Sequence, residues 1–268
     1  MRVADRIRTQ SVAPNTVAIW WLGQNSYVVQ GPAVSMMIDP FFSRPGDPAR
    51  YVHDGAPIRA NELQPDAVLC THNHSDHTDP PFLVALAQAS PETRFFGPPE
   101  SARAMVEAGI GTERVRAVSP GEALQVGGAT VGVVLSKTAE VSDVGHFGYI
   151  VNIGGMKVYD TGDIMRGVTR EPSLMAPLRL ALSAAEGRAG PHIALITTSP
   201  TEDEFPDFDE AAQLAIAVGA RVAVPAHYDC FARRTFDPKP FAAAFAGTPT
   251  RAEIIPYCGC YLYSLTNA

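Results

Sequence analysis

The order of apolar segments limits the fold of this chain more than any other feature. Short strand-like runs fill residues 17–40 and again residues 129–163, and each of these stretches leads into alternating helices and strands. Such a pattern is typical of sheets that carry helices on their outer faces. The 268 residues, 46% of them hydrophobic, are enough for a sizeable core, and no linker or internal repeat divides them. We therefore predict an α/β (α+β) fold in a single domain, residues 1–268.

Helical periodicity and turn residues place most of the remaining elements. Pro80 and Pro81 precede apolar side chains spaced as on one face of a helix, so a helix is expected to begin there. Gly154 and Gly155 lie between two alternating runs and predict a tight hairpin. Further helices are expected over residues 99–109, 172–187, 207–219 and 237–247, and a closing β segment over residues 252–265.

Composition argues against several classes of function. The formal net charge is -7, from 21 Lys and Arg against 28 Asp and Glu, whereas a nucleic-acid-binding protein needs a basic stripe for phosphates. The chain shows no apolar run of roughly 18 residues for a membrane span and no apolar signal segment at its N-terminus. Four cysteines are too few for a disulfide framework. We expect a cytoplasmic protein that acts on a small molecule, without nucleic acid or membrane partners, and we leave a homo-oligomer open.

The stretch CTHNHSDHTD, residues 70–79, holds three of the seven histidines of the chain. It follows an apolar run that predicts a buried strand ending at Thr71. His72 and His74 are two residues apart, so both imidazoles point the same way in an extended segment. Asp76 and His77 come next. Imidazoles and a carboxylate gathered at the end of a strand are typical of a metal site, because both groups bind divalent metal ions.

The His-x-His-x-Asp-His spacing resembles the first motif of the metallo-β-lactamase superfamily. The resemblance spans about residues 16–230 and implies a four-layer αββα sandwich. It implies site roles for Asp39 after a strand, for Asp163 as a bridge between two metals, and for His227 at a late strand end. Within the superfamily, the chain looks most similar to the L-ascorbate-6-phosphate lactonase-like branch, on the segments APNTVAIWWLGQNS, PDAVLCTHNHSDHTD and RVAVPAHYD.

The chain departs from the family pattern at one position. Many members carry a third histidine well before the bridging aspartate, and the corresponding segment LSKTAEVSD holds none. The nearest candidate is His146, which either binds a metal or lies beside the site. Without it, the protein would hold one metal instead of two. The metal ligands implied by the motif and the resemblance are His72, His74, Asp76, His77, Asp163 and His227, with His146 as the seventh candidate.

This ligand set predicts a metal-dependent hydrolase. One or two divalent ions, Zn or Mn with Fe as an alternative, would supply a metal-bound hydroxide near neutral pH. Asp76 is the predicted catalytic residue, because a carboxylate there can bind metal and also accept a proton. Tyr228 is a candidate donor to an oxyanion, and Arg233 and Arg234 are candidates for binding a substrate phosphate or carboxylate. We expect a small polar lactone or ester as substrate, and the resemblance implies a sugar lactone, with or without a phosphate.

Three alternatives stay open at this point. The same site suits a phosphodiesterase that acts on small phosphodiesters. A di-iron oxidoreductase of this superfamily generally has Glu where this chain has His74, and it usually works with a flavin domain for which this chain has no room. The third alternative is a non-catalytic metal- or metabolite-binding module, against which Asp76 argues because a purely structural site has less use for a carboxylate there.

Overall fold

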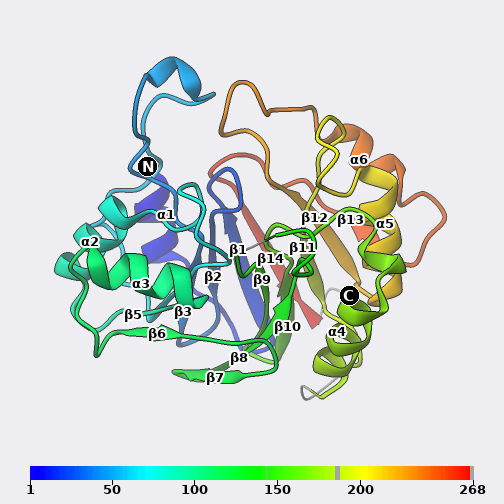
Figure 1. Cartoon of the computed structure of the whole chain (residues 1–268), viewed down its shortest axis with the longest axis horizontal. Helices are drawn as coiled ribbons and strands as arrows, with labels where there is room; N and C mark the ends of the chain where they lie inside the picture. The colour runs from blue at the N-terminus through cyan, green and yellow to red at the C-terminus, as the bar shows by residue number, and fades with distance from the viewer. Residues whose placement is uncertain (143, 185–187, 266–268) are drawn as a thin grey trace.

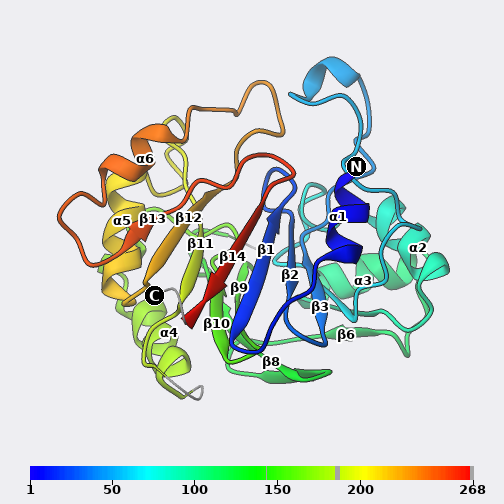
Figure 2. The ribbon, with the colours of Figure 1, turned by 180° about the vertical axis from the view of Figure 1, so that it is seen from behind.

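Two β-sheets face each other in this structure, and helices cover both outer faces. The computed structural model describes residues 1–142, 144–184 and 188–265. Within these ranges each sheet has seven strands, and the layers of helix, sheet, sheet and helix are visible in Figure 1 and, from behind, in Figure 2. The αββα sandwich predicted from the sequence is therefore confirmed.

The first sheet draws on the N-terminal part of the chain and on its last strand. Its strands are β1 (Thr16–Trp21), β2 (Tyr27–Gln30), β3 (Ser35–Ile38), β4 (Ala67–Leu69), β5 (Arg94–Gly97), β6 (Val115–Ala117) and β14 (Cys260–Ser264). They lie in the order β14-β1-β2-β3-β4-β5-β6, and the strands from β3 to β6 run parallel. The helices on its outer face are α1 (Val3–Thr9), α2 (Pro80–Ala89) and α3 (Pro99–Glu107).

The second sheet is built from strands between residues 123 and 252. Its strands are β7 (Ala123–Val126), β8 (Ala129–Leu135), β9 (Phe147–Ile153), β10 (Met156–Asp160), β11 (Ile193–Thr197), β12 (Val222–Ala226) and β13 (Arg251–Ala252). They lie in the order β13-β12-β11-β10-β9-β8-β7, and the strands from β10 to β13 run parallel. The helices on its outer face are α4 (Pro172–Ala184), α5 (Phe208–Ala217) and α6 (Lys239–Ala243), and two 3-10 helices, η1 (Pro48–Arg50) and η2 (Val168–Arg170), lie in loops.

Strand β1 shows why its sequence is apolar from position 17 to position 21. Ile19 and Trp21 point into the core between the two sheets, whereas Ala18 and Trp20 point into the core beneath α1. Alternate side chains of a strand face opposite sides, so a strand covered on both faces has no polar position left. Trp20 keeps one polar contact, because its Nε1 donates to Gln30 Oε1 (2.7 Å).

The hairpin predicted at Gly154 and Gly155 is confirmed. It joins β9 to β10, and both glycines have positive φ, as the tight turn requires. The helix expected over residues 237–247 is shorter, since α6 ends at Ala243. The prediction of one closing β segment over residues 252–265 was wrong. Pro256 interrupts this segment, and its two strands, β13 and β14, belong to different sheets.

Helix α1 has no counterpart among the sequence predictions. It buries Val3, Ala4 and Ile7 against the first sheet. The expected helix over residues 172–187 matches α4 as far as Ala184, and residues 185–187 lie outside the described ranges. No helix in the described ranges combines the length and the apolar character needed to cross a membrane.

Several residues that directly follow or precede a strand meet at one edge of the sandwich. Parallel strands end at the same edge of a sheet, so β3 and β4 bring Asp39 and His72 close together in the first sheet. In the second sheet, Asp163 follows β10 and His227 follows β12. His146 directly precedes β9, which is antiparallel to β10, and therefore lies at this edge as well.

Gly162 lies at this edge against residues of both sheets, Thr71 after β4 and Phe147 at the start of β9. The amide of Phe147 donates to the carbonyl oxygen of Thr71 (2.9 Å) and thereby joins β9 to the end of β4. Gly162 has a φ of 52°, and a Cβ there would collide with the Phe147 carbonyl oxygen and lie 2.9 Å from the Thr71 Cβ. The turn that orients Asp163 therefore depends on glycine at position 162.

Replacing Gly162 with alanine should lower the free energy of unfolding by about 2–4 kcal/mol, because the methyl group meets backbone and the conformation is left-handed. Gly128→Ala is the matched control, since no heavy atom lies within 4 Å of a Cβ there; it should change stability by less than about 0.5 kcal/mol. Urea denaturation of both variants measures the difference. Equal midpoints for the two variants would contradict this explanation.

Candidate metal centre

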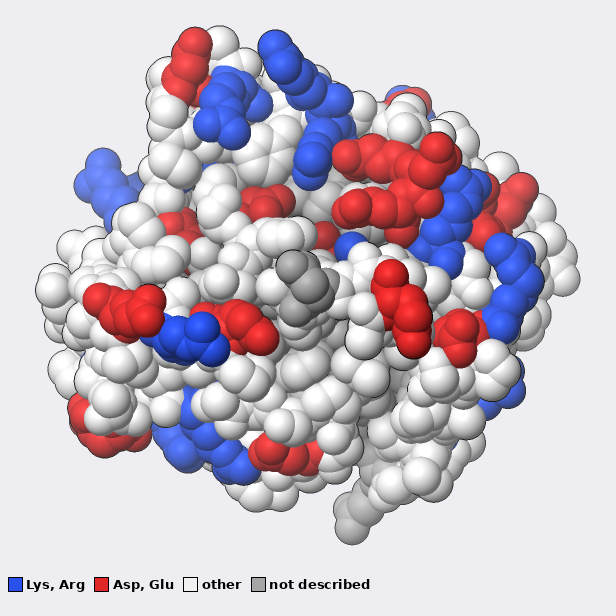
Figure 3. All heavy atoms as spheres, viewed as in Figure 1, with Lys and Arg blue, Asp and Glu red and all other residues white. Residues whose placement is uncertain are grey.

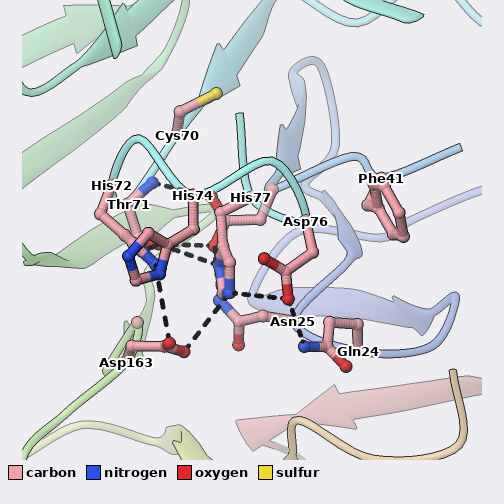
Figure 4. A network of polar contacts seen from close by, with 12 residues as sticks. Gln24, Asn25, Phe41, Cys70, Thr71, His72, His74, Asp76, His77 and Asp163 are labelled. Carbon is pink, nitrogen blue, oxygen red and sulfur yellow. Dashed lines mark hydrogen bonds and ion pairs between the residues drawn. The ribbon is translucent and has the colours of Figure 1, made fainter. Parts of the chain in front are cut away.

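Five imidazoles and two carboxylates gather at this edge, and Figure 4 shows most of them. Among the described residues, their potential ligand atoms form three overlapping groups, each within 4.8 Å: His72, His74 and His146; His72, His77 and Asp163; Asp76, His77 and His227. The middle group shares a histidine with each of the other two. The structure therefore brings all seven predicted ligands into one continuous cluster.

The carboxylate of Asp163 lies between the two outer groups. Its Oδ2 is 3.6 Å from His72 Nε2, while its Oδ1 is 3.5 Å from His77 Nε2 and 3.4 Å from His227 Nε2. The side chain is buried. One oxygen faces each group, which is the arrangement required for a carboxylate that bridges two cations.

His146 reaches this cluster from the second sheet. Its ring stacks on that of His72 with the centroids 4.1 Å apart, and it lies 5.4 Å from the ring of His74. The residue is buried, and its Nδ1 has no hydrogen-bond partner in the described part of the chain. The structure therefore places His146 beside the first two histidines of the motif, a position that its sequence spacing left open.

Buried polar atoms without partners test whether a metal fits here. His77 Nε2, His146 Nδ1 and Asp163 Oδ1 have no hydrogen-bond partner within the described ranges. An unpaired buried polar atom costs roughly 1–3 kcal/mol. A divalent cation would satisfy imidazole nitrogens and a carboxylate oxygen in such positions. The donor set and its burial fit a metal centre.

Asp39 orients one of these histidines from beneath. Its Oδ2 accepts hydrogen bonds from His77 Nδ1 (2.7 Å), Thr71 Oγ1 (2.6 Å) and Asn25 Nδ2 (2.8 Å), and its Oδ1 accepts one from Thr71 N (2.7 Å). The bond to Nδ1 turns Nε2 of His77 toward Asp163. A carboxylate that holds the far nitrogen of an imidazole is typical support for a metal-binding histidine.

The histidines of the cluster titrate very differently without a metal ion. Burial alone would lower the pKa of His77, but the carboxylates of Asp163, Asp39 and Asp76 outweigh it and raise that pKa to about 10. Burial, assisted by the Lys137 ammonium, lowers the pKa of His146 to about 3. At neutral pH one positive charge therefore resides on His77, while His146 is neutral and keeps a lone pair for a cation.

Gln24 belongs to this site and was missed by the sequence analysis. Its Nε2 donates to Asp76 Oδ2 (2.9 Å) and lies 2.9 Å from His227 Nε2. Backbone bonds fix it, because Gln24 N donates to Tyr228 O (3.0 Å) and His227 N donates to Gln24 O (3.0 Å). One buried amide therefore orders two predicted ligands. The segment GQN signalled a turn in the sequence, but not that its side chain would enter the site.

Lys137 is a second residue that the sequence analysis missed. Its side chain is only 6% exposed, and its Nζ lies 3.7 Å from Glu204 and 5.3 Å from the centre of the Phe205 ring. Burial lowers the pKa of His146, and the Lys137 ammonium lowers it further. Burial raises the pKa of Asp163, but the imidazoles of His227, His77 and His72 and, less strongly, the Lys137 charge outweigh it and lower that pKa. In the sequence, the segment that contains Lys137 was distinguished only by its lack of a histidine, and nothing in it indicated a role for this lysine.

The predicted substrate-binding residues take two different positions. Tyr228 is buried, and its ring packs on that of Trp21 with the centroids 4.5 Å apart. Its role as a donor to an oxyanion stays a prediction. Arg233 and Arg234 are exposed and line a cavity that also reaches Asp76.

With this geometry in hand, the chain can be assigned to a family. A family model described as the beta-lactamase superfamily domain matches residues 18–227, which is more than half of the chain. The chain therefore belongs to this superfamily, and the metallo-β-lactamase assignment drawn from the histidine motif is confirmed.

Relatives and solved structures agree with this assignment. A UPF0173 metal-dependent hydrolase of Symbiobacterium thermophilum is 25% identical over 239 residues, which cover 88% of this chain and 95% of that protein. A UPF0173 metal-dependent hydrolase of Thermoplasma volcanium is 26% identical over 240 residues, which cover 87% of this chain and 93% of that protein. Igni18, a metallo hydrolase of Ignicoccus hospitalis, shares the fold with a TM-score of 0.71 at 17% identity, covering 93% of this chain and 99% of that chain. The lactonase-like branch is not among these descriptions and stays a prediction.

Replacing Asp39 with asparagine should destabilise the protein by roughly 2–5 kcal/mol, because the new amide group faces donors and leaves buried groups unpaired. Metal affinity should fall about 10–100-fold as His77 loses its orientation. Asp66→Asn is the control, since Asp66 also accepts a backbone hydrogen bond, from Ser35 N (2.8 Å), but is exposed. Chemical denaturation and competition with a chelator measure the two effects. Unchanged metal affinity in Asp39→Asn would refute the orienting role.

A cation that binds Nε2 of His77 has to displace a proton. The pKa of His77 is raised from its usual value near 6.5 to about 10, so the ring is protonated at pH 7.5 in the metal-free protein. Metal uptake at pH 7.5 should therefore release about one proton or more, and the apparent affinity should increase as the pH rises toward 10. Calorimetric titration in buffers of different ionisation enthalpy counts the protons. Uptake without proton release would show that His77 is neutral or does not bind metal.

Proposed function

We propose that this chain is a metal-dependent hydrolase that binds two divalent ions side by side. The observation that carries the proposal is the position of Asp163, whose two carboxylate oxygens face two different groups of histidines. The descriptions of the UPF0173 relatives as metal-dependent hydrolases support it. One ion would be held by His72, His74, His146 and Asp163, and the other by Asp76, His77, His227 and Asp163.

Zn and Mn are the metals that we propose, with Fe as the alternative. Imidazole and carboxylate ligands suit all three ions. When bound, such ions lower the pKa of water and polarise a carbonyl or phosphoryl oxygen under attack.

Protein groups around the cluster would provide the proton transfer and the charge balance. Asp76 has a partly exposed side chain, and Gln24 holds its Oδ2 in place. Asp76 is therefore positioned to accept the proton of an attacking water molecule. Lys137 supplies a buried positive charge near Asp163 and His146, where it would offset negative charge that develops on the substrate.

A small polar lactone or ester is the substrate class that we propose. A cavity of about 570 Å³ adjoins Asp76 and falls within the size range of small-molecule sites. The sugar lactone, with or without a phosphate, rests on the resemblance to the lactonase-like branch alone. A small phosphodiester is the alternative that the same ligand set would serve.

Elemental analysis of the purified protein tests the binuclear centre directly. We expect about two equivalents of divalent metal per chain, and about one in His146→Ala, because the first group then loses a ligand. His53→Ala is the control, since His53 lies outside the three groups and bonds to Asp229 instead (2.9 Å); it should keep two equivalents. One equivalent in all three proteins would exclude His146 from metal binding.

Turnover of a substrate panel tests the hydrolase itself. The panel contains simple lactones, aryl esters and bis(4-nitrophenyl) phosphate, which separates lactonase or esterase activity from phosphodiesterase activity. Asp76→Ala should lose at least about 100-fold in kcat/KM toward the preferred class, because a metal ligand and a proton acceptor are removed together. If no class is turned over by the metal-loaded protein, the non-catalytic module becomes the better description.

A further inference from the structure

We propose that the substrate carries an anionic group, a carboxylate or a phosphoryl group, which Arg50 and Arg233 hold at the mouth of the site. This inference rests on the proposed function for the position of the reacting bond, near Asp76. The anion site itself rests on independent observations, which concern the cavity, the loops that build it and the pairing of their charges.

The cavity beside Asp76 has a basic rim. Arg50, Arg233 and Arg234 line it, together with Ser75 and Asp76 of the histidine motif. A molecule that fills this cavity would therefore contact both Asp76 of the candidate metal centre and the guanidinium groups. The chain as a whole has a formal net charge of -7, so three arginines on one cavity are a local exception.

Two segments distant in sequence are joined to build this rim. Ala232 N donates to Arg50 O (2.9 Å), Val52 N donates to Cys230 O (2.9 Å), and Tyr51 forms an isolated β-bridge with Phe231. The rings of Tyr51 and Phe231 are also in contact, with centroids 5.6 Å apart. These contacts fix the backbone of Arg50 and of the segment 230–232, which Arg233 directly follows.

The arginines of the rim differ in how their charges are balanced. Arg234 pairs with Glu202 (3.2 Å), whereas Arg50 and Arg233 have no carboxylate within 4 Å in the described ranges. Figure 3 shows basic side chains over the loops at the top of the molecule and a group of acidic side chains beside them. Two guanidinium groups thus remain available to a ligand at the mouth of the site.

Within the described ranges, the two carboxylates that also line the cavity, Asp47 and Asp76, form no ion pair with Arg50 or Arg233 and have other hydrogen-bond partners. Asp47 accepts a hydrogen bond from Ala49 N (2.9 Å) and caps η1. Asp76 accepts one from Gln24 at the metal-centre end. A planar guanidinium group donates two parallel hydrogen bonds to a carboxylate or a phosphate, so paired arginines favour these anions over neutral ligands.

Direct binding of simple anions to the full chain as purified tests this proposal. The probes are inorganic phosphate and succinate, titrated calorimetrically into the unsubstituted protein, Arg50→Ala, Arg233→Ala and Arg103→Ala. Arg103 is the matched control, an exposed arginine of α3 that does not line the cavity. We expect at least one probe to bind, and each rim variant to bind it roughly tenfold more weakly. Arg103→Ala should bind as the unsubstituted protein does.

The outcomes separate this proposal from the hydrolase assignment. Preference for phosphate or for succinate identifies which kind of anion the substrate carries. Equal binding by all four proteins means that metal ions or other groups hold the anion, and it overturns the proposal even if hydrolysis is observed. Failure of both probes to bind the unsubstituted protein overturns it as well. Loss of binding in the rim variants alone supports the anion site whether or not the metal content is as expected.

Discussion

The buried carboxylate of Asp39 is the contact on which the rest of the site depends. It accepts hydrogen bonds from the backbone and hydroxyl of Thr71, from Asn25 and from His77, all between 2.6 and 2.8 Å. Its donors come from the turn after β1, the segment after β4 and the motif loop, and Asp39 itself directly follows β3. A charge with no exposure to water is tolerable only with such complete pairing. The same pairing fixes the direction in which the imidazole of His77 faces the cluster.

The second sheet supplies the remaining candidate ligands, next to the motif loop that Asp39 holds at the edge of the first sheet. Asp163 and His227 follow parallel strands, and His146 precedes the strand that hairpins into β10, so all three arrive at the edge where the motif loop lies. The bond from Phe147 N to Thr71 O keeps the edges of the two sheets together at this point. The site is therefore a property of the sandwich as a whole, and neither sheet alone contains either group of ligands.

Most of the fold and the centre of the site could be predicted from the sequence, because both depend on local patterns. The spacing of apolar residues in the strands and helices predicted the layers. The motif from His72 to His77 is contiguous in sequence and could therefore be recognised directly. His146 could only be a candidate, since its approach depends on the β9–β10 hairpin and on the packing of two sheets. Gln24 was missed because its left-handed backbone and its contact with His227 are tertiary features.

Drawing ligands from both sheets has a consequence for the way in which the protein is made. The motif histidines leave the ribosome early, but the first of the three groups also includes His146, the second includes Asp163, and the third includes His227 near the end of the fold. In a growing chain the imidazoles of the motif would therefore lack the other candidate ligands until the second sheet has docked. If these residues bind metal as proposed, metal uptake would come late in folding, and it would draw the equilibrium toward the docked sandwich instead of any partly folded form.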